Sequence, residues 1–398
     1  MENFLKQSAK FTHWCQQDAL PYWAKFAHDP EGGYYEQLAL CGAPDIDHSR
    51  RVRVQARQAY VYAHAAHMGW FDGARAASDH AWNYLMGPGC QGGETVSGTG
   101  YKGCAHLLNA DGSLLDGQRD SYAQAFVILA GAWRYMAFKD EASLKTAYDT
   151  LAFLDSHAAA SNGGWLEGVP PSLPRRQNPH MHLFEALMAL YDATGDAAIL
   201  ERVGRIYTLF TDIFFEPMTR TIIEFFYADW RYHIGNGGPV EPGHMLEWCW
   251  LLREYSRRSG VDVDHYADGL YDSAVKLGRH PKLGLISDTV NMQLGKSSGT
   301  YRTWPQTEYL KASIVQAQAG REGMDNAAGE IIETIFKRYL SVEIKGGWVD
   351  KLGRRGEIIE PIMPTSTFYH ILGAAAIASD HAANLRDSDS AYPRPILA

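Results

Sequence analysis

The stretch RQNPHMHLFEALMAL, from Arg176 to Leu190, places two histidines and a glutamate at the start of an apolar run. A second stretch, VEPGHMLEWCWLL from Val240 to Leu252, repeats the order of Pro, His, Glu three residues after the His, and an apolar run. Both are typical of buried helices, because Pro is tolerated in the first turn and the residues that follow are apolar on all sides. Their spacing of roughly 60 residues indicates a repeated unit.

Four other apolar stretches share this character. The six stretches begin near Arg57, Asp120, His180, His244, Trp304 and Thr365. Each of the first five is followed by a Gly- or Asp-containing turn and a more charged, amphipathic stretch, which predicts a hairpin of two helices. A helix predicted over residues 3–27 has no apolar predecessor, so it can pair with the sixth stretch and close a ring.

This pattern predicts an all-α protein, an (α/α)6 barrel of six helical hairpins, in which residues 1–398 form a single domain. The more apolar helices are expected inside; an open solenoid is the alternative. The loops before these helices are rich in aromatic residues and glycine, which predicts short β-hairpins at the N-terminal end of the inner helices. Functional residues are expected at that end, because backbone N–H groups at helix starts point toward a ligand.

The composition argues against several classes of partner. Among 398 residues, 46% are hydrophobic and the formal net charge is −9, so neither nucleic acid nor an anionic membrane is an expected partner. The five cysteines are scattered without a C-x-x-C pair, which argues against disulfides and fits a reducing compartment. Neither a signal pattern nor an apolar run of about 18 residues is found. We therefore expect a soluble, cytoplasmic protein, monomer or homodimer, with a small-molecule partner.

The sequence predicts neither a metal site nor a nucleotide site. His180 and His182 are two residues apart, so on a helix they point in different directions. His64 and His67 lie deeper in their helix, and no carboxylate accompanies them. The segment GKSS at residues 295–298 lacks the earlier glycine of a phosphate-binding loop, so no cofactor is expected.

Helix starts that lie far apart in the sequence meet at one end of such a barrel. Five residues near these starts are expected to face one cavity, namely Arg57, His182, His244, Trp304 and His370. His182 has Glu185 three residues later on the same helix face, and that carboxylate can orient the imidazole ring. His244 and Glu247 have the same spacing and the same expected relation. Ordinary i, i+3 pairs without a catalytic role are the alternative.

Aromatic and acidic side chains complete the predicted binding site. Trp165, Trp304 and Trp348 are candidate walls for the C–H face of a sugar ring. Asp120 and Glu308 add carboxylates at the mouth of the barrel. We predict substrate contacts from Arg57, His182, Glu185, Glu247, Trp304, Glu308 and Asp120.

These motifs together resemble one enzyme family over nearly the whole chain. The motifs are NPHMHLFEA, EPGHMLEWCWLL, Arg57 within VQARQAY, WPQTE and STFYHIL. They are similar to those of the N-acylglucosamine 2-epimerase superfamily of (α/α)6-barrel sugar isomerases and epimerases, and most similar to its mannose isomerase and sulfoquinovose isomerase branch. The resemblance implies a metal-free enzyme that opens a pyranose ring and moves a proton near C1 and C2. It implies roles for Arg57, His182, Glu185, His244, Glu247, Trp304 and His370.

The chemistry gives these residues expected roles. The C2 proton of an open-chain aldose is weakly acidic, so catalysis needs a base and a group that holds the developing enediolate. His244 and His370 are the predicted acid and base, in either order, and Arg57 is the predicted cation for the enediolate oxygens. Return of the proton to C1 from the same face gives a ketose, and return to C2 from the opposite face gives an epimer.

On the family resemblance, we expect interconversion of D-mannose and D-fructose. The alternatives are a sugar 2-epimerase, a sulfoquinovose isomerase, a glycoside hydrolase that uses two carboxylates, and a non-catalytic sugar-binding protein. A sulfonated or phosphorylated substrate would need a second cation near the site, for which Arg175, Arg176 and Lys311 are candidates.

Overall fold

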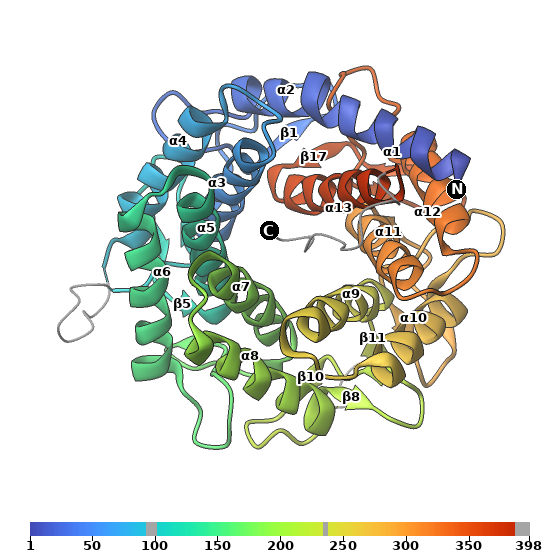
Figure 1. The fold of residues 1–398 in the computed structure, drawn as a ribbon. Helices are drawn as coiled ribbons and strands as arrows, with labels where there is room; N and C mark the ends of the chain where they lie inside the picture. Colours follow the sequence, from blue (N-terminus) through green and yellow to red (C-terminus); the bar gives the residue numbers. More distant parts are fainter. Residues whose placement is uncertain (93–101, 234–237, 387–398) are drawn as a thin grey trace.

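Six helices form a closed inner ring in the computed structural model, which describes residues 1–92, 102–233 and 238–386 (Figure 1). In chain order they are α3 (Val52–His67), α5 (Ser121–Phe138), α7 (Asn178–Thr194), α9 (Pro242–Ser259), α11 (Thr303–Gln318) and α13 (Phe368–Arg386). Each inner helix contacts the next, and α13 contacts α3, so the ring closes.

Each inner helix packs against an outer helix. The consecutive pairs are α3 with α4 (Ala74–Met86), α5 with α6 (Glu141–Phe153), α7 with α8 (Ala197–Leu209), α9 with α10 (Asp264–Gly278) and α11 with α12 (Met324–Ile335). The N-terminal helix α1 (Glu2–Trp14), which leads toward α2 (Leu20–Phe26), packs against both α12 and α13. The first and last helices thus form the sixth pair, and the predicted (α/α)6 barrel is confirmed.

The sequences of the two kinds of helix explain their places. In α5, SYAQAFVILAGAWRYMAF, buried residues lie on every side, because this helix is enclosed by two inner neighbours and an outer partner. In α8, AAILERVGRIYTL, the buried residues Ile199, Val203 and Ile206 form one stripe, whereas Glu201 and Arg205 are exposed. An apolar stripe on one face suits a helix that packs on the ring and faces solvent.

Local features determine where these helices begin and how closely they pack. At the start of α5, the carboxylate of Asp120 accepts a hydrogen bond of 3.0 Å from the backbone N–H of Tyr122. Gly131 allows α5 and α6 to approach closely, since a Cβ at this position would lie 2.6 Å from the carbonyl oxygen of Ser143. The apolar pattern alone placed Arg57 at the start of its helix. In the structure, helix α3 begins at Val52, so Arg57 lies in the second turn.

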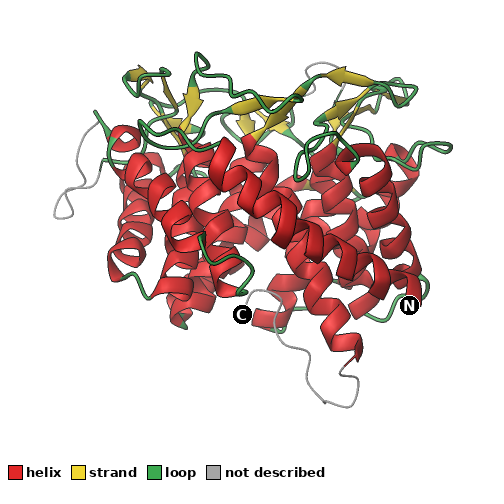
Figure 2. Ribbon diagram, turned by 90° about the horizontal axis from the view of Figure 1, so that it is seen from above, coloured by secondary structure: helices red, strands yellow, loops and turns green. Residues whose placement is uncertain are grey.

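Short strands lie at one end of the barrel, where the inner helices begin (Figure 2). One strand comes shortly before each inner helix; these are β2 (Arg50–Arg51), β5 (Arg119–Asp120), β7 (Arg175–Arg176), β11 (Pro239–Val240), β14 (Tyr301–Arg302) and β17 (Ile362–Pro364). These strands hold the loops against the rim of the ring and so place the first turns of the inner helices around a common space.

Most of these strands pair antiparallel with a strand from the next loop around the ring. The partners are β3 (Leu107–Leu108) for β2, β6 (Gly168–Val169) for β5, β10 (Phe225–Phe226) for β7, β12 (Val290–Asn291) for β11 and β15 (Lys351–Leu352) for β14. Strand β17 pairs with β1 (Gln37–Ala39), with Leu38 opposite Met363, and thereby joins the last loop to the first.

The remaining strands extend these sheets or form a separate hairpin. β4 (Leu114–Asp116), β13 (Lys296–Ser297) and β16 (Ile358–Glu360) add third strands, while β8 (Phe215–Glu216) pairs with β9 (Thr221–Ile222). The hairpins predicted at this end of the barrel are therefore present. The pairing between successive loops was not predicted, because it joins segments that are far apart in the sequence.

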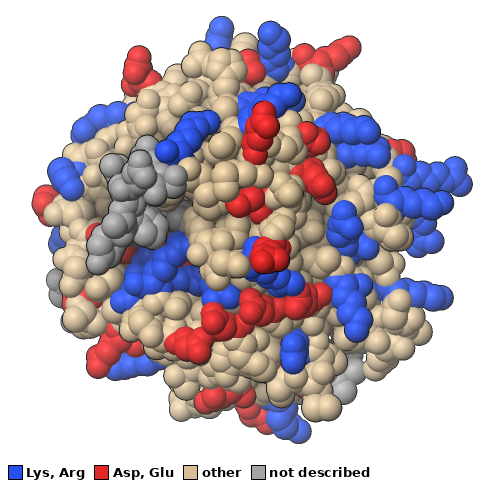
Figure 3. Space-filling model, turned by 45° about the vertical axis from the view of Figure 1, so that its right-hand side comes forward, with Lys and Arg blue, Asp and Glu red and all other residues tan. Residues whose placement is uncertain are grey.

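The outer surface carries both signs of charge. On the face shown in Figure 3, acidic and basic side chains are interspersed among other residues, which make up most of the visible surface. None of the helices in the described ranges combines the length and the hydropathy needed to cross a membrane. The predicted domain ran to residue 398, and residues 387–398 lie outside the described part of the chain.

Candidate active site

A cavity of about 380 Å³ lies at the strand-bearing end of the barrel, among the first turns of the inner helices. Six of the nine predicted site residues line it, namely Arg57, His182, His244, Glu247, Trp304 and His370. They come from α3, α7, α9, α11 and α13, so the ring brings together side chains that are far apart in the sequence. The other three predicted residues lie behind the cavity wall.

His244 lies in the first turn of α9, close to a pair of carboxylates. Its Nδ1 is 3.0 and 3.1 Å from the two oxygens of Glu224 and 3.6 Å from Oε2 of Glu241. Burial alone lowers the pKa of His244, but the charges of Glu224 and Glu241 raise it to about 10. The imidazole is therefore protonated at neutral pH, and its Nε2–H lies 3.3 Å from the side-chain amide of Asn178, whose oxygen can accept this proton donor and which also lines the cavity.

The predicted pairing of His244 with Glu247 is wrong. The i, i+3 spacing places both residues on one face of α9, but the imidazole turns toward Glu224, in the loop between β9 and β10. Glu247 instead lies near His182, with Oε1 3.9 Å from Nδ1. Within the described ranges, this buried oxygen has no hydrogen-bond partner, so Glu247 has a free polar atom at the cavity wall. Burial and the charge of Glu308 raise the pKa of Glu247 well above its ordinary value.

His370, in the first turn of α13, has the opposite environment. Its Nδ1 lies 2.8 Å from Oε1 of Glu308, and Oε2 of Glu308 lies 2.7 Å from Nζ of Lys311. Burial lowers the pKa of His370 to about 3, although Glu308 opposes this shift. Burial alone would raise the pKa of Glu308, but Lys311 and His370 lower it. An ionised Glu308 accepts the Nδ1–H of neutral His370, which leaves the Nε2 lone pair for the cavity.

Arg57 is held by aromatic side chains. Its guanidinium carbon lies 4.2 Å from the ring centre of Phe126 and 4.8 Å from that of Tyr369, and it donates a hydrogen bond of 2.7 Å to the hydroxyl of Tyr122. The Nε atom of Arg57 is buried without a hydrogen-bond partner among the described residues. A fixed cation with an unused donor at the cavity wall suits an anionic ligand or intermediate.

The predicted pair of His182 and Glu185 is present, with Nδ1 3.3 Å from Oε2. Burial and the neighbouring charge of Arg57 keep the pKa of His182 well below its ordinary value, so this imidazole is neutral. Glu185 does not line the cavity; it lies behind His182 and accepts a hydrogen bond from the hydroxyl of Tyr369. Glu185 therefore orients His182 and has no direct access to a ligand.

The other two carboxylates predicted to bind substrate also lie behind the wall. Glu308 is fully buried between His370 and Lys311, as its hydrogen bond and ion pair require. Asp120 caps α5, and its Oδ2 lies 3.3 Å from Nδ1 of His106 and 3.8 Å from the guanidinium of Arg53. Both carboxylates interact with charged neighbours in the interior, so they do not need a ligand as a partner and instead support residues of the cavity wall.

The three tryptophans that were predicted to form sugar-binding walls differ in position. The ring of Trp304 lies between the two catalytic candidates, 5.3 Å from the ring centre of His244 and 5.5 Å from that of His370. Trp348 is buried and stacks on Trp23 at 4.1 Å, and Trp165 is not part of the cavity wall. Only Trp304 of these three can therefore contact a ligand there.

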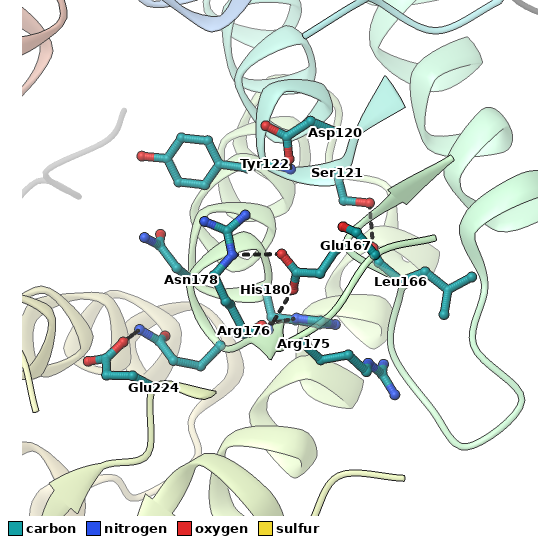
Figure 4. Close-up of polar contacts among 12 residues, drawn as sticks. Asp120, Ser121, Tyr122, Leu166, Glu167, Arg175, Arg176, Asn178, His180 and Glu224 are labelled. Atoms are coloured by element: carbon teal, nitrogen blue, oxygen red, sulfur yellow. Dashed lines mark hydrogen bonds and ion pairs between the residues drawn. The ribbon is translucent and has the colours of Figure 1, made fainter. Parts of the chain in front are cut away.

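The three predicted sources of a second cation do not line the cavity. Arg175 and Arg176 leave β7 in different directions (Figure 4), as successive residues of a strand do. Arg176 pairs with Glu167 at 2.7 Å, Arg175 lies 3.3 Å from the ring centre of Trp230, and Lys311 is paired with Glu308.

Several cavity residues were missed from the sequence. They are Gln37, Arg51, Arg53, Tyr122, Asn178, Glu241, Arg302, Asp350, Glu360, Ile362, Pro364, Ser366 and Thr367. Asn178 and Glu241 fall inside the two repeated stretches, and Arg53 precedes Arg57 by one helical turn, so these three had a detectable signal. Glu224, the main partner of His244, lies in a loop between two-residue strands, where no periodicity indicates a function.

Residues in and behind the cavity wall form three clusters, two of which share Glu247, and within each cluster the ligand atoms lie within 4.8 Å of one another. They are His182 with Glu185 and Glu247, Glu224 with Glu241 and His244, and Glu247 with Glu308 and His370. The sequence argument against a metal considered only histidines that are close in the chain, and it could not detect clusters formed between helices. A metal-free reaction therefore stays a prediction.

Comparisons with known proteins agree with the fold and indicate the family. The family N-acylglucosamine 2-epimerase (GlcNAc 2-epimerase) matches residues 33–374. A mannose-6-phosphate isomerase of Rhizobium meliloti (strain 1021) is 35% identical over 379 residues, which cover 92% of this chain and 95% of that protein. A D-mannose isomerase of Thermobifida fusca is 30% identical over 244 residues, covering 58% of each protein. The crystal structure of a D-mannose isomerase superposes with a TM-score of 0.80 at 22% identity, over 95% of this chain and 97% of that one.

Proposed function

The chain belongs to the N-acylglucosamine 2-epimerase family and is a sugar isomerase, and we propose that it interconverts D-mannose and D-fructose through a cis-enediolate. The observation that carries the proposal is the contrast between two histidines beside Trp304. His370 is neutral at physiological pH and His244 is protonated, because their carboxylate partners differ in number and position. One base and one acid at the same cavity are what proton transfer between neighbouring carbons requires.

Ring opening comes first. Protonated His244 donates its Nε2 proton to the ring oxygen of the pyranose, and the neutral imidazole then takes the proton from the hydroxyl on C1. The aldehyde forms and the ring C–O bond breaks, with no net change in protons on the protein. Glu224 and Glu241 stabilise the protonated state of His244 before each turnover.

Isomerisation follows on the open chain. His370 takes the C2 proton through Nε2, and the electrons move to the aldehyde oxygen, where Arg57 stabilises the negative charge. The protonated His370 exchanges its proton with solvent and returns a proton to C1 on the same face, while His244 carries the proton of the C2 hydroxyl to O1. The product is the ketose. Glu308 stabilises the transient charge on His370, to which its carboxylate is hydrogen-bonded at 2.8 Å.

The remaining wall residues have binding roles in this proposal. The side chains of Glu247 and Asn178 each have a buried polar atom without a hydrogen-bond partner in the described part of the chain, and both residues line the cavity. Such atoms are costly unless a ligand satisfies them, so sugar hydroxyls are suitable partners. His182 is placed to bond a further hydroxyl, and Trp304 offers a flat apolar surface to the C–H groups of the sugar.

The mannose-6-phosphate isomerase and the D-mannose isomerase described above are 35% and 30% identical to this chain, whereas a cellobiose 2-epimerase of Bacteroides fragilis is 25% identical. This difference favours the isomerase over the 2-epimerase, which would return the proton to C2 from the opposite face. The same pair of histidines also suits that reaction, so the products decide. We would incubate the protein with D-mannose, D-fructose, D-glucose and cellobiose in deuterated water and identify the products and the labelled carbon. Fructose formed from mannose with deuterium at C1 supports the proposal. Glucose labelled at C2 identifies an epimerase, and transfer without solvent label in either direction contradicts the enediolate.

A further inference from the structure

We infer that Lys311 is a positioning residue for the reaction, because its ammonium compensates the charge of Glu308 and thereby keeps His370 neutral, with Nε2 free to act as the base. Lys311 does not line the cavity, so it acts on the sugar only through Glu308 and His370. This inference rests on the proposed function, in which His370 takes the C2 proton. It explains why the two histidines beside Trp304 differ in protonation.

The two histidines have nearly the same immediate surroundings. Each lies in the first turn of an inner helix, each side chain is 8% exposed, and each Nδ1 atom faces a carboxylate. The distance is 3.0 Å from His244 to Glu224 and 2.8 Å from His370 to Glu308. Burial and one neighbouring carboxylate are common to both histidines, so they do not explain why only His244 is protonated.

The difference lies on the far side of each carboxylate. The ammonium of Lys311 lies 2.7 Å from Oε2 of Glu308, and this lysine side chain is 3% exposed. Glu224 instead accepts a hydrogen bond from the neutral amide of Gln177, and it forms no ion pair with a lysine or arginine of the described residues. The second carboxylate near His244, that of Glu241, only adds negative charge.

The charges around Glu308 favour a neutral imidazole. The charges of Lys311 and Glu308 cancel, so a further charge on His370 would be unpaired in a buried site. The ammonium lies 4.2 Å from the ring centre of Trp250, and the indole N–H of Trp250 donates a hydrogen bond of 2.8 Å to the same oxygen of Glu308. These contacts hold Glu308 in place, and its other oxygen, Oε1, accepts the Nδ1–H of His370.

The other charged groups around His370 do not replace Lys311. Burial, Arg57 and Lys311 lower the pKa of His370, whereas Glu308 raises it. Of the lysines and arginines in the described structure, only Lys311 forms an ion pair with Glu308. Two further carboxylates face this group, Glu185 on α7 and Glu247 on α9, and burial raises the pKa of both. The neutral titratable side chains nearby are Tyr60, His64, His182 and Tyr369.

Replacing Lys311 by methionine removes the charge and retains a long side chain. We expect His370 to take up a proton from solvent and to balance part of the charge of Glu308, as His244 does beside Glu224. A protonated His370 cannot take the C2 proton. At pH 7, kcat/KM for D-mannose should therefore fall by at least about tenfold, mainly through kcat, because each unit by which the pKa of a base exceeds the pH lowers its neutral fraction about tenfold. The rate should recover in part at pH 9.

Two further variants and a control separate charge from packing. Lys311→Arg keeps the charge and should keep the pH profile of the wild type. Lys311→Met/Glu308→Gln removes both charges, so His370 should be neutral again and the rate at pH 7 should exceed that of Lys311→Met. Lys145→Met, on the exposed face of α6, should change neither the rate nor the profile. Trimethylamine N-oxide in every sample favours the folded state, and circular dichroism confirms the fold.

NMR of protein labelled with nitrogen-15 at histidine measures the protonation of His370 without turnover. The nitrogen shifts distinguish the two neutral tautomers from the imidazolium, and the signals missing in His370→Gln identify those of His370. We expect the neutral Nδ1–H tautomer at pH 7 in the wild type and in Lys311→Arg, and the imidazolium in Lys311→Met.

The outcomes separate this inference from the proposed function. A neutral His370 in Lys311→Met, or a loss of rate that is equal at every pH, overturns the role of Lys311. An imidazolium at His370 in the wild type overturns it as well. If the NMR signals change as expected but the wild type converts none of the sugars, Lys311 controls the protonation of His370 and the isomerase reaction is contradicted.

Discussion

Replacing Lys311 by methionine tests the buried charges behind the cavity. The side chain of Lys311 is 3% exposed, and its ammonium lies 2.7 Å from Glu308, which is fully buried. Removal of one partner of a buried ion pair typically costs about 3–5 kcal/mol, because the other charge is left without compensation. We expect Lys311→Met to lose about this much free energy of unfolding, and Lys311→Met/Glu308→Gln to regain a large part of it.

The effect should depend on pH in a defined direction. Lys311 and His370 lower the pKa of Glu308 below its ordinary value of 4.5 in the folded protein, against the opposing effect of burial. A depressed pKa contributes stability above the unfolded value, and that contribution is lost as the pH falls toward the folded one. The difference between wild type and Lys311→Met should therefore be largest near neutral pH and should narrow below about pH 4.5.

Urea unfolding, followed by circular dichroism at several pH values, measures this difference. The control is Lys145→Met on α6, whose side chain is 66% exposed and whose pair with Asp149 lies at the surface. A surface pair of this kind should contribute less than about 1 kcal/mol. The reasoning is refuted if Lys311→Met is as stable as the wild type, or if its loss of stability is the same at pH 4 as at pH 7.

Three further predictions concern the cavity. His370→Ala and His244→Ala should each lower kcat for mannose by at least about 10²-fold with a smaller change in KM, while the exposed His48→Ala should not; near-normal turnover in a folded His370→Ala protein would contradict the proton path. Glu224→Gln should move the alkaline limb of the pH profile of kcat/KM to lower pH, because Glu224 raises the pKa of His244, and a pH profile of kcat/KM equal to that of the wild type would reject this assignment. For the same reason, the free energy of unfolding of the wild type should fall as the pH rises from 6.5 toward 10. Activity should survive exhaustive chelation, and loss of activity that a divalent ion restores would place a metal in one of the Glu and His clusters.

The helical architecture could be predicted from the sequence because a helix buried on all sides and a helix buried on one side differ in their local pattern of apolar residues. Helix α5 is apolar on every side and α8 on one side only, and this contrast recurs along the chain. The site was partly accessible for the same reason, since His182 and His244 stand at the starts of such helices. The family resemblance then connected Arg57 and His370 to them.

The partners of the histidines could not be predicted as well from the sequence. The imidazole of His244 contacts Glu224, which lies in a loop, and not Glu247 on its own helix, because a contact made in the tertiary structure overrides the helical spacing. Similarly, the carboxylates of Asp120 and Glu308 were expected in the cavity but are engaged behind it. Side-chain direction and charge balance depend on neighbours that only the closed ring brings together, so sequence spacing cannot assign them.

The pairing of β1 with β17 and the packing of α1 on α12 and α13 connect the two ends of the chain. In an open solenoid, repeats contact only their neighbours, so units can be gained or lost at an end with little effect on the others. Here, deletion of one hairpin would leave two inner helices without the neighbours that cover them, and insertion of one would separate residues that must meet. We therefore expect insertions, deletions and substitutions in this barrel to alter the length and sequence of its loops, while the number of hairpins stays constant. Folding should be completed only when the N-terminal helix meets the last one, which makes the ends of the chain as important for cooperativity as its middle.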